Sequence, residues 1–140
     1  MPETFLVIRT PSGLSGDMLL AGLASLAGLE QADVDQLDAS LPLGELAGAA
    51  TLETRSAQGV SGRGMRVELP DTLAQRTLAD IRALIEASSL TARAKKYSRE
   101  AFAILAQAEG SVHGADPEDI HFHEVGATDS ILDTCLASAL

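Results

Sequence analysis

A chain of 140 residues is long enough for one domain with a real core, but too short for two large domains. Its formal charge of −10 would repel phosphates, which argues against a nucleic-acid partner or an anionic membrane surface. Aromatic residues make up 3% of the chain and Trp is absent, so Leu, Ala, Val and Ile must fill the interior. This composition favours packed helices with a small sheet.

The single cysteine, Cys135, rules out an internal disulfide and fits a reducing compartment. Its place among apolar residues at helical spacing indicates a small core residue rather than a reactive thiol. The N-terminus lacks the pattern of a secretory signal, and every apolar stretch is too short and too often broken by Gly or Ser to span a bilayer. We therefore expect a cytoplasmic protein.

The N-terminal third predicts one strand and two helices. Phe5–Ile8 is a short apolar run that indicates a buried strand, and a loop of small residues, 11–16, follows it. Leucines at helical spacing then predict a helix that Gly28 ends. Apolar residues at the spacing i, i+3, i+7 within 34–41 predict a second, short helix.

Two runs in the middle of the chain, 52–55 and 65–69, have alternating patterns typical of strands. They flank Gln58–Gly64, which contains three glycines, and together they predict a β-hairpin. Next, Thr77 and Asp80 have the spacing of a capping box, with Asp in place of the usual Glu. This box predicts a helix that ends near residues 88–89.

The C-terminal half predicts two longer helices. Thr91 can cap a helix that runs to about Val112 and ends at Gly114. The inward stripe of that helix is predicted to be Tyr97, Ala101, Leu105 and Ala108. Asp116 and Pro117 predict a short helical turn. Thr128 or Asp129 then caps a last helix, whose apolar side holds Ile131, Leu132, Cys135, Leu136 and Ala139. The whole predicts a single α+β domain over 1–140, in which the N-terminal strand and the hairpin form a small sheet against about five helices.

Residues 12–18 read SGLSGDM and form the first stretch that could carry chemistry. Gly13 and Gly16 let backbone amides face outward, and the following helix offers the positive end of its dipole. Such a loop can cradle a phosphate or a carboxylate, although it lacks the lysine of a P-loop. The structural alternative is that Gly16 relieves a tight turn and Asp17 favours the helix N-terminus electrostatically.

The second stretch, HFHE, contains two histidines separated by one residue. In an extended segment His121 and His123 point to the same side, while Phe122 turns the other way into the core. Two such imidazoles can share one divalent metal, which Glu124 or another carboxylate could complete. The alternative is that one histidine caps a helix and the other forms a hydrogen bond in the core. The third, His113, fits the C-terminal end of a helix.

Taken together, several runs resemble the N-terminal part of the LarC family of nickel-pincer cofactor biosynthesis proteins. They are SGLSGDM, QGVSGRGMRVEL, VHG and HFHEVGATDSILD, and RTLADI is similar to the family's RHLSDI-like helix start. The resemblance covers essentially all 140 residues in the family's order. Two long runs that match together are far more specific than either run alone.

The resemblance implies insertion of nickel into pyridinium-3,5-bisthiocarboxylic acid mononucleotide, which yields the cofactor of lactate racemase. It also implies the use of CTP with a divalent ion such as Mg or Mn, through a C-terminal part that this chain lacks. The chain is then the N-terminal module of a larger or two-piece protein. We expect it to contact the rest of its parent protein or a second subunit, and to form a homo-oligomer. Whether the domain alone is an active lyase is left open.

At three positions the chain differs from the family's pattern. Arg9 and Thr10 stand where the family usually has Asp-Cys, and Thr77 stands where the last residue of a histidine run would be. The polar residues that remain receive these predicted roles: His121, His123 and Asp129 as metal ligands, Asp17 and Glu124 as catalytic groups, and Ser12, Gly13, Ser15 and Gly16 as the mononucleotide loop.

Two other functions fit the same residues. The chain could be a non-catalytic assembly domain in which HFHE and SGLSGDM maintain a packed turn and an interface. It could instead be a divalent-metal hydrolase that uses His121, His123, Asp17 and a bound water.

Overall fold

The structure is a computed structural model that describes residues 5–11, 13–42, 49–68, 76–122 and 127–140. The helices and strands are, in chain order, α1 (Gly16–Ala27), α2 (Gln31–Asp38), β1 (Ala50–Ala57), β2 (Val60–Val67), β3 (Arg76–Thr77), α3 (Leu78–Ala87), α4 (Ala92–His113), the short 3-10 helix η2 (Pro117–Asp119), β4 (His121–Phe122) and α5 (Thr128–Ala139). Among these residues, no helix is both long and apolar enough to cross a membrane.

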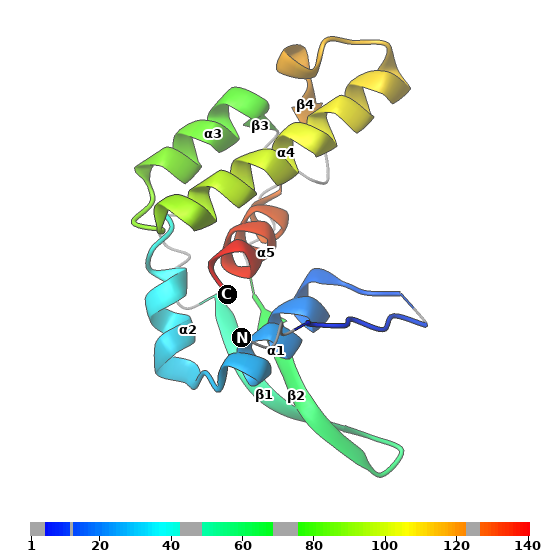
Figure 1. Ribbon diagram of the computed structural model, residues 1–140, viewed down its shortest axis with the longest axis vertical. Coiled ribbons are helices and arrows are strands. Elements are labelled where there is room, and N and C mark those ends of the chain that lie inside the picture. The colour runs from blue at the N-terminus through cyan, green and yellow to red at the C-terminus, as the bar shows by residue number, and fades with distance from the viewer. Residues whose placement is uncertain (1–4, 12, 43–48, 69–75, 123–126) are drawn as a thin grey trace.

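The helix α5 occupies the middle of the molecule (Figure 1). α3 and α4 pack together on one side of it, and α1 and the β1–β2 hairpin lie on the other, so that α5 contacts both α4 and α1. The strands form two separate two-stranded antiparallel sheets, β1–β2 and β3–β4. The α+β class predicted from the sequence is therefore confirmed.

The predicted β-hairpin is present and is longer than the two alternating runs suggested. β1 and β2 pair in register from Ala50 with Val67 to Ala57 with Val60. Gln58 and Gly59 form the two-residue turn, both with positive φ (50° and 81°), which is the backbone that tight hairpin turns require. α1 and α2 cover parts of the hairpin.

The buried face of α4 differs from the predicted one. The residues that face the interior are Ala94, Ser98, Phe102, Ala106 and Gly110. The predicted stripe was wrong by one position: Tyr97 is 51% exposed and Ala108 is exposed, whereas Ala101 and Leu105 are partly buried. The reason is steric, since four small side chains let α4 approach its neighbours closely, and Phe102 fills the remaining space edge-on against Phe122, with ring centroids 6.2 Å apart.

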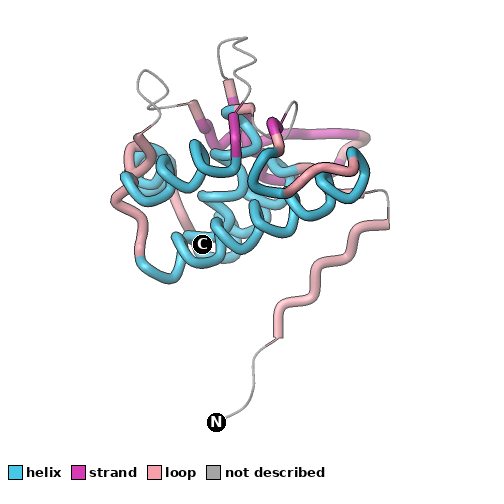
Figure 2. The backbone as a smooth tube through the Cα atoms, turned by 90° about the horizontal axis from the view of Figure 1, so that it is seen from above, coloured by secondary structure: helices cyan, strands magenta, loops and turns pink. Residues whose placement is uncertain are grey.

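The N-terminal segment, Phe5–Ile8, does not form the predicted buried strand. It has no strand partner among the described residues, and all four of its apolar side chains are more than half exposed. Figure 2 shows the segment leading away from the helices towards the N-terminus. An apolar run indicates a preference for β structure, but a strand also needs an edge with which to pair, and neither small sheet offers it one.

The predicted helix boundaries largely hold. Thr77 and Asp80 form the reciprocal capping box of α3, Thr91 caps α4 by accepting from the Ala94 amide at 3.2 Å, and left-handed Gly28 and Gly114 end α1 and α4. The predicted cap of α5 was wrong. The capping position is Ala127, and Thr128 is buried inside the helix, where its hydroxyl accepts from Arg76 at 3.3 Å. Cys135 is buried, as predicted.

Candidate functional site

The start of α1 places Asp17 between a hydroxyl and a guanidinium. Ser15 is extended, with φ −96° and ψ 163°, and turns its hydroxyl towards Asp17 Oδ1. Arg55 of β1 reaches Asp17 Oδ2 from the other side, with Nη1 at 3.4 Å. The hydrogen bond from Ser15 is the main reason that the pKa of Asp17 is lowered, with smaller contributions from the Met18 amide and Arg55. Asp17 is therefore a stable carboxylate at neutral pH.

Arg55 is held in this position by the hairpin. Its Nη2 donates to the Met65 carbonyl at 2.9 Å, and its Nε pairs with Glu53 at 2.5 Å. The side chain lies directly over Gly64, where a Cβ would stand 2.6 Å from Arg55 Cδ. This contact explains why residue 64 is glycine, because any larger residue would displace the guanidinium that contacts Asp17.

The carboxyl of Asp133, in the second turn of α5, packs against the start of α1. A Cβ built on Gly16 would lie 1.8 Å from Asp133 Oδ2, so only glycine fits beside this carboxyl. Asp133 Oδ1 is buried and has no hydrogen-bond partner among the described residues. An unsatisfied buried acceptor typically costs about 1–3 kcal/mol, so the absence of a partner calls for an explanation.

The pKa of Asp133 is raised to about 6, chiefly by burial of the carboxyl and to a smaller extent by the negative charges of Asp129 and Asp17. Near neutral pH the carboxyl is therefore distributed between its protonated and charged forms, unlike Asp17. Perturbed carboxyls of this kind cluster at functional sites. We name Gly16, Asp17, Asp129 and Asp133 the α1–α5 junction.

Asp133 was not singled out from the sequence, although it belongs to the HFHEVGATDSILD run. Asp129 and Asp133 stand four residues apart and therefore on one face of a helix, which is the signal that could have revealed it. Its meeting with Gly16, 117 positions earlier by number (133 − 16), carries no sequence signal.

His121 lies elsewhere in the molecule. It is exposed on β4 and stands opposite Thr77 of β3, next to the α3 capping box. Hydrogen bonds from Thr77 lower the pKa of Asp80, and the charge of His121 adds a small contribution in the same direction. We name Thr77, Asp80 and His121 the β3–β4 edge. Figure 1 shows β4 at the upper end of the molecule and α1 on the far side of α5.

The structure thus places Asp17 and Asp129 near enough to Asp133 for their charges to raise its pKa, and it places His121 near Asp80. Three further predicted site residues, Ser12, His123 and Glu124, lie outside the described residues. Within the described ranges, no three His, Cys, Asp or Glu side chains converge in a way that could hold a metal ion. His113 is paired with Glu109 at 3.2 Å in the last turn of α4, in line with its predicted place at a helix end.

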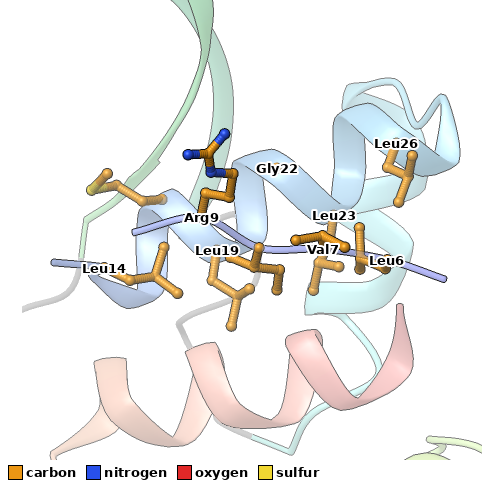
Figure 3. A pocket seen from close by; sticks show the side chains of 10 residues that line it. Leu6, Val7, Arg9, Leu14, Leu19, Gly22, Leu23 and Leu26 are labelled. Atoms are coloured by element: carbon orange, nitrogen blue, oxygen red, sulfur yellow. The ribbon is translucent and has the colours of Figure 1, made fainter. Parts of the chain in front are cut away.

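An apolar groove of about 320 Å³ runs between the N-terminal segment and α1 (Figure 3). Its walls are almost entirely aliphatic: Leu6, Val7 and Ile8 on one side, and Leu14, Leu19, Leu23 and Leu26 on the other. The outer side chains of this region stay exposed, including Met18 at 55% and Leu26 at 68%. A surface of this kind is typical of contacts with another protein segment.

Comparison with known proteins agrees with the sequence motifs. The family described as "Nickel insertion protein" matches residues 6–140. The chain is 41% identical over 138 residues to a protein of Akkermansia muciniphila named "Pyridinium-3,5-bisthiocarboxylic acid mononucleotide nickel insertion protein", covering 91% of this chain and 33% of that one. A protein of the same name from Desulfitobacterium hafniense is 43% identical over 126 residues, which cover 87% of this chain and 30% of that one. Another from Staphylococcus saprophyticus is 39% identical over 132 residues, which cover 90% of this chain and 32% of that one.

No solved structure matches this chain. The chain spans about a third of the length of the curated relatives that it matches. Because the family match extends over nearly the whole chain, including both the SGLSGDM and HFHEVGATDSILD runs, this chain belongs to the nickel insertion protein family.

Proposed function

We propose that this chain is the N-terminal module of a nickel insertion protein that acts on pyridinium-3,5-bisthiocarboxylic acid mononucleotide. The observation that carries the proposal is the family match over residues 6–140, together with relatives of that name at about 40% identity. The α1–α5 junction supports it, because residues of both motif runs meet there. Asp133, whose pKa is raised, comes from HFHEVGATDSILD, and Gly16, on which it packs, comes from SGLSGDM.

The reaction requires a protein that holds Ni(II), its cargo, weakly enough to release it to sulfur ligands. Imidazole and carboxylate groups bind Ni(II) with suitable intermediate strength. The proposed ligands are His121, His123 and Asp129. The proposed acid–base groups are Asp17 and Glu124, and Ser12, Gly13, Ser15 and Gly16 border the mononucleotide.

The remaining two-thirds of the family's length would supply the other requirements. CTP and its divalent ion, Mg or Mn, are proposed to bind there. The module is proposed to act in the cytoplasm, as part of a homo-oligomer and in contact with the rest of the parent protein or a second subunit.

A chimera tests the proposal directly. Residues 6–140 replace the matching third of the Akkermansia muciniphila protein, and formation of the nickel-loaded mononucleotide is measured with CTP and Mg or Mn present. The chimera is expected to insert nickel. A folded chimera that inserts none would contradict the proposal.

The ligand assignment has its own test in the same chimera. Replacing His121 and His123 together by Ala should lower nickel insertion at least about tenfold, since two of the proposed ligands are lost. His113→Ala is the matched control, because His113 is an exposed histidine that pairs with Glu109 at the end of α4. Equal rates in the double variant and the control would refute the assignment.

A second function, a non-catalytic assembly domain, is favoured by one observation, the exposed apolar groove beside α1. Under this alternative the chimera would assemble but insert no nickel. The hydrolase alternative receives no support from the described residues, because Asp17 lies with the α5 carboxyls and His121 lies beside Asp80.

A further inference from the structure

A second, more polar hollow lies between the N-terminal half of α4, the outer face of α5 and the first residue of α1. Its volume is about 610 Å³, within the range of small-molecule sites. The residues used below are Gly16, Arg93, Tyr97, Asp133, Thr134 and Ser138. We name it the α4–α5 hollow.

One end of the hollow suits an anion. Arg93 lies in the first turn of α4, where the helix dipole also favours negative charge, and it makes no ion pair or hydrogen bond with the described residues. A guanidinium in this position can bind phosphate oxygens through two parallel N–H groups.

The other end suits a positive charge or a donor. Asp133 Oδ1 is buried without a partner in the part of the chain that the structure describes, and Asp17 and Asp129 add negative charge near it. The Asp133 carboxyl packs directly on Gly16, which also lines the hollow, so the loop that begins α1 borders this negatively charged end.

An exposed aromatic side chain also lines the hollow. Tyr97 is 51% exposed, because the neighbouring residue Ser98 faces the interior of the molecule in its place. Its face is available for a flat, cationic ring. Beside it on α5, the Ser138 hydroxyl donates to the Thr134 carbonyl at 2.7 Å and keeps its own acceptor positions for a ligand.

We propose that the α4–α5 hollow binds a pyridinium mononucleotide, with its phosphate on Arg93, its ring on Tyr97 and its positively charged ring nitrogen on the side of Asp133. The identity of the ligand rests on the proposed function. The arrangement is independent of it: the Arg93 guanidinium and Asp133 Oδ1 have no partner among the described residues, and the exposed Tyr97 ring lines the same hollow.

The first test measures binding of nicotinamide mononucleotide, a pyridinium mononucleotide, to this chain by calorimetry. Arg93→Gln should weaken binding about tenfold or more, because the charge-assisted contact to phosphate is lost. Tyr97→Leu should weaken it several-fold, whereas Tyr97→Phe should retain it, since the ring face is kept. Arg99→Gln is the control, because Arg99 lies on α4 outside the hollow and pairs with Glu86.

The reduced form of the same mononucleotide tests the role of Asp133. Its ring is neutral and its phosphate is unchanged, so the chain should prefer the oxidised form, and Asp133→Asn should reduce that preference. No binding of the oxidised form at millimolar concentration, or equal affinity in the Arg93, Tyr97 and Arg99 variants, would overturn the proposal.

The chimera separates this proposal from the proposed function. If the chimera inserts nickel and its Arg93→Gln variant does so equally well, the hollow is not the substrate site, and the function stands. If the chain binds nicotinamide mononucleotide through Arg93 and Tyr97 but the chimera inserts no nickel, the site stands and the function fails.

Discussion

The α1–α5 junction and the β3–β4 edge receive residues from the same short run, HFHEVGATDSILD, yet they are physically different places. At the junction a half-buried carboxyl packs on a glycine that admits no side chain, and its pKa is raised to about 6. At the edge an exposed histidine stands beside a capping box in which Asp80 Oδ2 accepts hydrogen bonds from the Thr77 amide and hydroxyl. Within this module the run therefore contributes to two regions, and the proposed ligand set of His121, His123 and Asp129 would draw on both.

The largest expected effect concerns the contact that defines the junction. Gly16→Ala should destabilise the chain by about 2 kcal/mol, because the new Cβ would overlap Asp133 Oδ2 and Cγ and force α1 and α5 apart. Urea unfolding measures the change. Adding Asp133→Ala to Gly16→Ala should recover most of the loss, since the overlapping carboxyl is then absent.

The matched control is Gly22→Ala, also in α1, where a Cβ would meet nothing within 4 Å. It should be neutral or stabilise the helix by up to about 1 kcal/mol. If Gly16→Ala behaved like Gly22→Ala, the close contact between α1 and α5 would be refuted.

A smaller effect is expected from the charge of Asp133. Its folded pKa, about 6, lies above the usual aspartate value of 3.8, so the folded chain binds more protons than the unfolded chain between these values. The contribution of Asp133 to the free energy of unfolding should therefore fall as pH rises from about 4 through 6, and then level off. Asp133→Asn should stabilise the chain at pH 8 by about 1 kcal/mol, a figure reduced for solvent screening of a half-buried group, with little gain at pH 4.

Thermal unfolding of both proteins across this pH range provides the measurement. The difference in stability between Asp133→Asn and the parent chain should follow the titration of one group. A difference that is constant from pH 4 to 8 would show that Asp133 does not titrate as the structure indicates.

The smallest expected effect is a change in the pKa of Asp133, which tests whether the junction and the edge are electrostatically separate. Asp17→Asn removes one of the charges that raise the pKa of Asp133, so it should lower that pKa, whereas His121→Ala should leave it unchanged. Carbon-13 NMR titration of the Asp133 carboxyl distinguishes the two. An equal shift in both variants would mean that the junction and the edge belong to one electrostatic site.

Much of the fold could be predicted because its signals are local. Thr77 and Asp80 stand three residues apart and cap α3, Gly114 ends α4, and the alternating runs form the β1–β2 hairpin. The prediction for the N-terminal segment failed because a strand needs a partner, and the sequence of Phe5–Ile8 does not reveal whether one is available. The prediction of the buried face of α4 failed because the size of the residues, rather than their hydrophobicity, decides which face is buried. Close approach of neighbouring helices is allowed by Ala94, Ser98, Ala106 and Gly110.

The candidate site divides along the same line. The sequence by itself determined the family, through SGLSGDM and HFHEVGATDSILD, and it placed Asp17 and Gly16 at the start of a helix. Only the tertiary structure decided that Asp133 meets Gly16, that its carboxyl is held near pKa 6, and that Arg93 and Tyr97 border the same hollow. Local hydrogen bonds and side-chain periodicity depend on residues that are close in sequence, whereas burial and the proximity of charges depend on which helices pack together.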